Sequence, residues 1–150
     1  EHFITNLIRK KILVAIDGYS GMAKPNAEEW LLFLPDGELH EIGLLFSKFI
    51  LKVRGKRVIY LGQTVPLDEV IVYCKKYNPA FVLTFFTASY TTESIVQYLE
   101  KISALAPNTK ILVAGAQTCS IESHWSNVEL INSVYDLIRI ADFSASQVVV

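Results

Sequence analysis

An acid, a histidine and a glycine stand close together in the segment PDGELHEIG, residues 35 to 43. Glu38 precedes His40 by two residues, and Gly43 follows His40 by three. A neutral imidazole binds a transition metal through one ring nitrogen, while the other nitrogen donates a hydrogen bond that fixes the tautomer. Glu38 is placed to accept that bond, and Gly43 leaves room beside the backbone for a large planar ligand. The spacing therefore predicts a metal-binding histidine with a carboxylate behind it.

The metal is expected to reach His40 already coordinated. One imidazole without a neighbouring cysteine or a cluster of carboxylates is poor support for a zinc site with three or four protein ligands. A structural interpretation stays open, in which His40 caps a helix and Glu38 is only a favourable charge near the helix start. The surrounding elements have to decide, because so short a pattern often arises by chance.

Strands and helices alternate along the chain after an opening helix. Residues 2 to 16 carry apolar side chains at helical intervals, and Gly18, Gly21 and Pro25 follow them. The predicted strands are EEWLLFL, RVIYLG, AFVLTFF, KILVAG and the shorter VELI. Helical patterns cover residues 42 to 53, 66 to 77 and 92 to 105, and a last one lies near SVYDLIRIADF.

This alternation predicts the α/β class, a doubly wound sheet of five parallel strands with helices on both faces. Ligands bind such sheets outside the carboxyl ends of the strands, at a topological switch point. Residues 35 to 43, 84 to 89 and 115 to 118 are expected to meet there. His40 should therefore lie at the ligand edge and not in the core.

The same segments resemble a known family, the cobalamin-binding domains with an Asp-x-His-x-x-Gly motif, a later Ser-x-Leu-like segment and a Gly-Gly pair. ELHEIG at 38 to 43, TFF at 84 to 86 and GA at 115 and 116 follow in the family's order. The resemblance spans residues 28 to about 142 and is strongest to the C-terminal domains of MerR-type transcription regulators, through LLFLP, RVIYLGQTVP and VYDLIRIADF. It implies a flavodoxin-like or Rossmann-like cobalamin-binding domain over residues 28 to 150.

The resemblance also implies roles for the motif residues. His40 would replace the cofactor's own base as the lower axial ligand of cobalt, and the displaced nucleotide tail would thread into the fold. Glu38 would be the hydrogen-bond partner of His40. It stands where most family members have Asp, and it can make the same bond although it is one methylene longer.

The two later segments would receive the tail. The hydroxyl of Thr84 matches a family Ser or Thr that bonds to the buried tail base. Gly115 and Ala116 match small residues that admit the tail beside the sheet. Ala116 replaces the second glycine of the family pair, and its methyl group beside the tail could weaken binding, but this departure does not abolish the resemblance.

The N-terminus carries a second resemblance to the regulator branch. There a helical bundle precedes the cobalamin domain and covers the upper face of the cofactor with a Trp and a later Glu-His pair. Glu1 and His2 resemble the end of that motif, and residues 1 to 20 resemble the last helix of the bundle, whereas Trp30 belongs to the first strand. The resemblance implies a fragment whose bundle and DNA-binding portions lie upstream. Its apolar helix face should pack on a neighbouring chain or on the domain's own surface.

Other chemistry-bearing residues support weaker predictions. His124 and Trp125 are expected to pack or to lie at the surface. Ser89, Thr91 and Thr92 follow the third strand and could contact a ligand, but Thr92 is equally a helix N-cap. No G-x-G-x-x-G motif follows the first strand, and no Ser-His-Asp or paired-carboxylate arrangement is apparent.

Composition limits the partners. The 150 residues are 51% apolar and carry a net charge of −1 without a basic stripe, so DNA would be reached only through a missing N-terminal domain. No apolar run has the roughly 18 residues that a membrane helix needs. Cys74 and Cys119 lie outside any metal-binding spacing and favour a reducing compartment. We expect a cytoplasmic, non-membrane protein.

Three functions remain open at this point. The first is the cobalamin sensor of a transcription regulator, in which adenosyl- or methylcobalamin changes how subunits or a DNA-binding domain associate. The second is an enzyme subunit, either a corrinoid carrier in methyl transfer or the cobalamin domain of a mutase. The third is a degenerate domain without cofactor. We predict the sensor, with no catalytic residues of its own, and leave open whether it is a homo-oligomer.

Overall fold

A parallel sheet of five strands in the order β2-β1-β3-β4-β5 forms the centre of the protein. The strands are β1 (Glu29–Pro35), β2 (Arg57–Val65), β3 (Phe81–Phe85), β4 (Lys110–Ala114) and β5 (Val128–Leu130). The helices are α1 (His2–Gly18), α2 (Ile42–Val53), α3 (Leu67–Tyr77), α4 (Thr92–Leu105) and α5 (Val134–Ser144), with a short 3-10 helix η1 (Ala116–Thr118). The predicted α/β class and its parallel sheet are confirmed.

The structure is a computed structural model that describes residues 2–88 and 90–144, and of His2 only the backbone. The predictions made for the Glu1–His2 pair and for Ser89 therefore lie outside the described residues.

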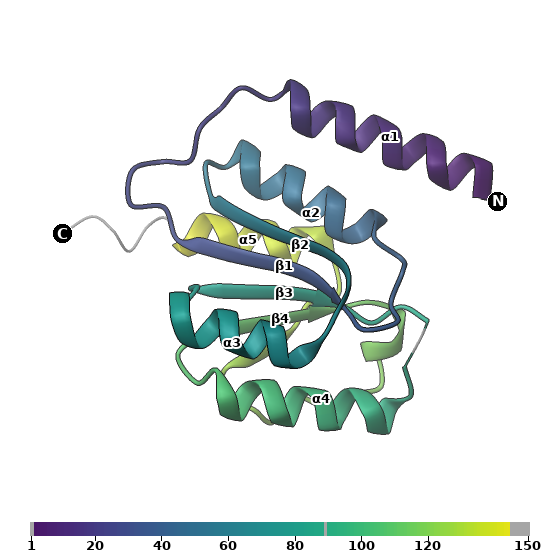
Figure 1. Cartoon of the computed structure of the whole chain (residues 1–150), viewed down its shortest axis with the longest axis vertical. Helices are drawn as coiled ribbons and strands as arrows, with labels where there is room; N and C mark the ends of the chain where they lie inside the picture. Colours follow the sequence, from purple (N-terminus) through teal and green to yellow (C-terminus); the bar gives the residue numbers. More distant parts are fainter. Residues whose placement is uncertain (1, 89, 145–150) are drawn as a thin grey trace.

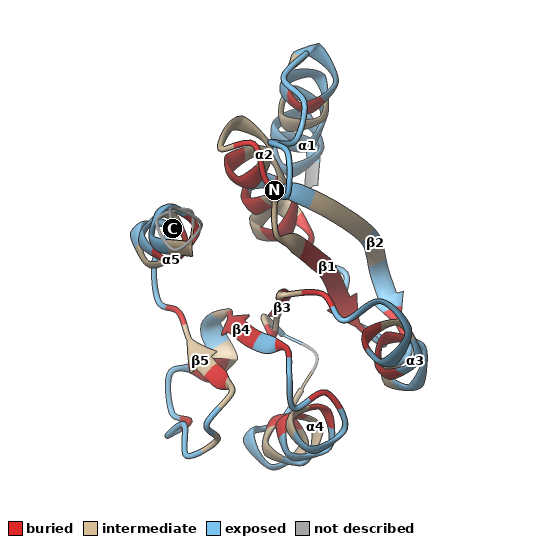
Figure 2. Ribbon diagram, turned by 90° about the vertical axis from the view of Figure 1, so that its left-hand side faces the viewer, coloured by how far each residue is buried: buried red, intermediate tan, exposed pale blue. Residues whose placement is uncertain are grey.

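Helices cover both faces of the sheet. Figures 1 and 2 show α2 and α5 on one face, α3 and α4 on the other, and α1 outside α2. The chain runs from β1 to β2 on one side and then crosses to β3, so the connections diverge between β1 and β3. This is the flavodoxin-like strand order, whose ligand crevice lies at the carboxyl ends of those two strands.

The first strand is buried on both faces, which explains its continuous apolar run. Leu31 and Phe33 pack toward α3 and α4, whereas Trp30, Leu32 and Leu34 pack toward α2 and α5. Successive side chains of a strand point to opposite faces, so both clusters take alternate residues from the same segment. A sheet covered on both sides results, and its loops carry the polar residues.

Three local features differ from the sequence prediction. Strand β2 continues past Gly62 to Val65, and Gly62 and Thr64 have positive φ angles of 93° and 51°. The N-cap of α4 is Thr91 and not Thr92, because the Thr91 hydroxyl accepts from the backbone N–H of Ser94. The 3-10 helix η1 after β4 was not predicted.

Helix α1 packs on the domain's own surface against α2. Ile16 is buried there, and Arg9 pairs with Glu41, which also accepts a hydrogen bond from the hydroxyl of Tyr60. The outer part of α1 leaves large apolar side chains exposed, namely Phe3, Ile4, Leu7, Ile8 and Val14. Within the described residues, no helix has the length and apolar character needed to cross a membrane.

Candidate functional site

The acid-x-His-x-x-Gly segment lies in the loop between β1 and α2. After Pro35 the chain turns through Gly37, which has a φ of 80°, and the backbone N–H of Glu38 donates to the carbonyl of Pro35 at 3.0 Å. This turn directs the Glu38 side chain inward, where it is fully buried. The loop after β1 therefore holds the buried Glu38 side chain close to the C-terminal ends of the strands.

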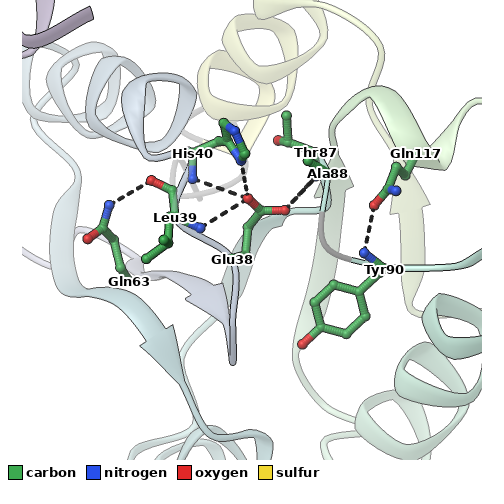
Figure 3. Close-up of polar contacts among 8 residues, drawn as sticks. All are labelled: Glu38, Leu39, His40, Gln63, Thr87, Ala88, Tyr90 and Gln117. Atoms are coloured by element: carbon green, nitrogen blue, oxygen red, sulfur yellow. Dashed lines mark hydrogen bonds and ion pairs between the residues drawn. The ribbon is translucent and has the colours of Figure 1, made fainter. Parts of the chain in front are cut away.

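Five hydrogen bonds satisfy the Glu38 carboxylate (Figure 3). Oε1 accepts from the backbone N–H groups of Leu39 and His40, each at 3.1 Å, and lies 2.6 Å from Nδ1 of the His40 ring. Oε2 accepts from the backbone N–H groups of Thr87 and Ala88 at 2.9 and 3.1 Å. Burial alone would raise the pKa of Glu38, but the bonds from His40, Thr87 and Ala88 lower it to about 2. The carboxylate is ionised at neutral pH.

The ionised carboxylate fixes the state of the His40 ring. A carboxylate only accepts hydrogen bonds, so the proton of a neutral imidazole must sit on Nδ1. The lone pair is then on Nε2, for which no hydrogen bond is found among the described residues. The His40 side chain is 58% exposed. A fixed tautomer and an exposed nitrogen lone pair are what a metal-binding histidine requires.

Further polar contacts join the motif loop to its neighbours (Figure 3). Gln63, in the extension of β2, donates from Nε2 to the carbonyl of Leu39 at 2.7 Å. The hydroxyl of Tyr90 donates to the carbonyl of Asp36 at 2.6 Å, and its backbone N–H donates to Oε1 of Gln117 at 3.0 Å. The loops after β1, β3 and β4 are thus held together at one edge, as the fold class predicts.

A cavity of about 400 Å³ opens at the same edge, between the sheet and the helices α2 and α5. We call it the α2–α5 pocket. Its lining comprises Gly43, Phe46, Ser47, Phe85, Ala114, Gly115, Ala116, Cys119, Ile131, Asn132, Ser133, Val134 and Leu137. Three of the residues predicted from the sequence therefore meet here, namely Gly43, Gly115 and Ala116.

Each glycine of the pocket has a specific steric reason. A Cβ at Gly43 would lie 2.8 Å from Cε1 of Phe85, so the planar group beside Gly43 in this structure is the Phe85 ring. A Cβ at Gly115 would lie 2.2 Å from the carbonyl oxygen of Phe86, and Gly115 has a φ of 115°. Gly115 is thus required by the path of the backbone beside Phe86.

Thr84 does not face the pocket. It pairs with Val113 and Phe85 pairs with Ala114, so the two residues point to opposite faces of the sheet. Val113 packs toward α3 and α4, whereas Ala114 packs toward α2 and α5. The Thr84 hydroxyl is buried without a hydrogen-bond partner among the described residues. The side chain on the pocket side of the sheet is that of Phe85, which the sequence did not single out.

The remaining candidates take structural positions. Cys74 is buried in the α3 core, where burial raises the pKa of its thiol to about 11. Cys119 is exposed at the rim of the α2–α5 pocket. The rings of His124 and Trp125 stack with centroids 4.0 Å apart. The prediction that His124 packs or lies at the surface agrees with this position.

Sequence comparison relates the chain to a regulator. It is 32% identical over 108 residues to the HTH-type transcriptional repressor CarA of Myxococcus xanthus, a match that covers 71% of this chain and 37% of the repressor. The chain thus spans little more than a third of the length of that relative. No protein-family profile matches the sequence.

Structure comparison finds the same fold in cobalamin proteins. A cobalamin-binding protein from Desulfitobacterium hafniense superimposes with a TM-score of 0.63 at 18% identity, over 83% of this chain and 60% of the other. The methanol:cobalamin methyltransferase complex MtaBC from Methanosarcina barkeri gives 0.67 at 18% identity, over 87% and 51%. The monomethylamine corrinoid protein of M. barkeri gives 0.57 at 19% identity, over 92% and 62%. The resemblance to cobalamin-binding domains drawn from the sequence is confirmed by this shared fold and by the relation to the repressor.

Proposed function

We propose that this chain, which has the fold of cobalamin-binding domains and a transcriptional repressor as a relative, is the cobalamin sensor domain of a transcription regulator. The observation that carries the proposal is the pair formed by Glu38 and His40. A fully buried carboxylate with a pKa of about 2 fixes the imidazole tautomer, and Nε2 of the 58% exposed His40 side chain has no hydrogen-bond partner among the described residues.

The residues present fit the cofactor. Bound cobalamin would supply a cobalt centre that can take an imidazole nitrogen as a ligand. Nε2 of His40 would be that nitrogen, and Glu38 would hold the ring through Nδ1. The α2–α5 pocket, whose lining includes Gly43, Gly115 and Ala116, offers about 400 Å³ for the displaced tail. Thr84 is left out of this set because its side chain faces away from the pocket.

The sensor interpretation is favoured over the corrinoid carrier by the sequence relation. The repressor is 32% identical over 108 residues, whereas the corrinoid proteins are 18 to 19% identical and share the fold alone. In a regulator, binding of the cofactor would change how the domain associates with its neighbours. The chain itself would bind the cofactor and hold its ligand, without a catalytic step.

Absorption spectroscopy tests the binding mode. The visible spectrum of aquacobalamin is expected to change when the purified chain is added, because His40 would replace the cofactor's own base on cobalt. The variant His40→Ala should lose that change, whereas His124→Ala, which removes an exposed imidazole stacked on Trp125, should keep it. An unaltered spectral change in His40→Ala would contradict the assignment of His40.

The regulatory role is tested on the complete gene product. Retardation of its promoter DNA in a gel is expected to change when cobalamin is added, and His40→Ala should remove that response. Retardation that cobalamin leaves unchanged, together with methyl transfer to the bound corrinoid by a methyltransferase, would favour the carrier instead.

A further inference from the structure

The α2–α5 pocket offers very few hydrogen bonds. Most of its lining is apolar, and the aromatic rings of Phe46 and Phe85 form part of its walls. The hydroxyl proton of Ser47 is donated to the carbonyl of Gly43 at 2.8 Å. The hydroxyl of Ser133 donates to Oδ2 of Asp136 at 3.0 Å and accepts from the backbone N–H of Asp136 at 3.3 Å.

Asn132 and Cys119 are the other polar side chains of the lining, and both are exposed at its rim. The amide of Asn132 supplies a strong donor, whereas a thiol is a weak one. The pocket can therefore donate a hydrogen bond to one acceptor atom at its mouth. It provides few hydrogen-bond partners for polar atoms that lie against Phe85 and Leu137.

Phe85 is held in place within the pocket. One edge of its ring lies over the backbone of Gly43, as the 2.8 Å approach of a Cβ built there shows. The ring also packs against the buried apolar side chains between the sheet and the helices α2 and α5. A flat group that enters beside the sheet would meet a positioned aromatic wall, which favours an offset-stacked or edge-on aromatic partner.

We infer that the α2–α5 pocket selects corrinoids whose tail base is a benzimidazole over those whose tail base is a purine, and that the apolar character of the Phe85 side chain maintains this preference. The inference rests on the proposed function and specifies its ligand. A displaced benzimidazole carries a single acceptor nitrogen, which the Asn132 amide can satisfy. A purine carries several acceptor nitrogens, and the apolar lining would leave those beyond the first unpaired. Each unpaired buried polar group costs about 1 to 3 kcal/mol, or roughly 5- to 150-fold in affinity.

Three corrinoids of different tail test the inference on the purified chain. They are cobalamin with its dimethylbenzimidazole, pseudocobalamin with an adenine, and cobinamide, which lacks the tail. Absorbance titration is expected to give cobalamin the lowest Kd, with pseudocobalamin weaker by at least about tenfold. Cobinamide should also bind more weakly than cobalamin, because it leaves the pocket unfilled.

Two variants assign the preference to Phe85. Phe85→Ser places a hydroxyl in the pocket and removes the aromatic wall, so the ratio of the two Kd values should fall severalfold. Phe85→Leu keeps the lining apolar and should retain the preference for benzimidazole. Thermal unfolding of each variant shows whether the fold is kept, and the ratio between two ligands on one variant cancels any loss of folded protein.

The outcomes separate the inference from the proposed function. Equal affinity for cobalamin and pseudocobalamin, with spectra that still depend on His40, would overturn the tail preference and leave the cobalt ligand standing. Equal affinity for cobinamide and cobalamin would show that Phe85 fills the pocket and no tail enters it, which also overturns the inference. No spectral change with any of the three corrinoids would contradict the proposed function itself.

Discussion

Glu38 does more for His40 than the spacing of the motif suggested. The sequence predicted one hydrogen bond from the imidazole, and the structure adds four from backbone N–H groups, two of which come from Thr87 and Ala88 beyond β3. Those two donors lie about 50 residues away in the chain, and backbone donors leave no mark in a sequence. The position of the acid could be predicted, but the network that keeps it ionised could not.

Replacing Glu38 by Gln tests its part in positioning His40. The neutral amide would turn an NH₂ group toward either the His40 ring or the N–H groups of Thr87 and Ala88, so one set of donors would lose its acceptor. Cobalamin affinity is expected to fall roughly 10- to 100-fold, as for other partners of metal-binding histidines. Glu93→Gln, in the first turn of α4, is the matched control. Equal affinities in the wild type and Glu38→Gln would reduce Glu38 to a charge near a helix start.

The low pKa of Glu38 also predicts a pH dependence of folding. The folded-state pKa is about 2, against an ordinary value of 4.5, so the contribution to stability is present above pH 4.5 and is lost as the pH falls from there toward 2. Urea unfolding from pH 6 to about 3 should show this loss, and Glu38→Gln should show a flatter profile. Identical profiles for the two proteins would contradict the low pKa.

The sequence singled out Thr84 as a residue that contacts the tail, but the structure places Phe85 at the pocket. The difference shows a limit of predicting which side chains of a buried strand face a site. Strand β3 is buried on both faces, so AFVLTFF has no alternation of polar and apolar residues to indicate which side chains face α2 and α5. A shift of one residue moves a side chain to the other face. The sequence could place this segment at the ligand edge of the sheet, but it could not decide which of its side chains face the α2–α5 pocket.

The elements themselves could be predicted well, because strands and helices in this fold differ in the period of their apolar residues. The predicted helices at 42 to 53 and 92 to 105 coincide with α2 and α4. The extension of β2 could not be predicted, since it passes through positive φ angles at Gly62 and Thr64 before the sheet pairing of Val65. That extension matters to the site, because Gln63 within it holds the Leu39 carbonyl.

The turn from β4 into η1 depends on Gly115. A Cβ there would clash with the backbone of Phe86, which cannot move aside as a flexible side chain can, and the φ of 115° is unfavourable for other residues. Gly115→Ala is expected to lower the free energy of unfolding by about 2 kcal/mol or more. Gly18→Ala, where nothing lies within 4 Å of the added Cβ, is the control and should be close to neutral. Urea denaturation midpoints that agree for both variants would contradict this account of the turn.

The charge of the whole chain limits what it can do alone. A net charge of −1 leaves little counterion release to drive association with DNA. We therefore predict that these 150 residues do not retard DNA in a gel, either at low salt or at about 150 mM salt. Operator-specific retardation by this chain alone would place a DNA-binding surface within it. That result would contradict the proposal that a separate domain of the regulator binds DNA.

The ligation of cobalt by His40 is tested most directly by electron paramagnetic resonance of the chain with bound cob(II)alamin. The unpaired electron couples to the axial nitrogen, so a ¹⁴N ligand splits each cobalt line into a triplet and a ¹⁵N ligand splits it into a doublet. Protein grown with ¹⁵N-histidine and loaded with unlabelled cofactor distinguishes the imidazole from the cofactor's own base. We predict the doublet, and its loss in His40→Ala. A triplet that labelling leaves unchanged would show that the cofactor keeps its own base on cobalt and would contradict the proposed role of His40.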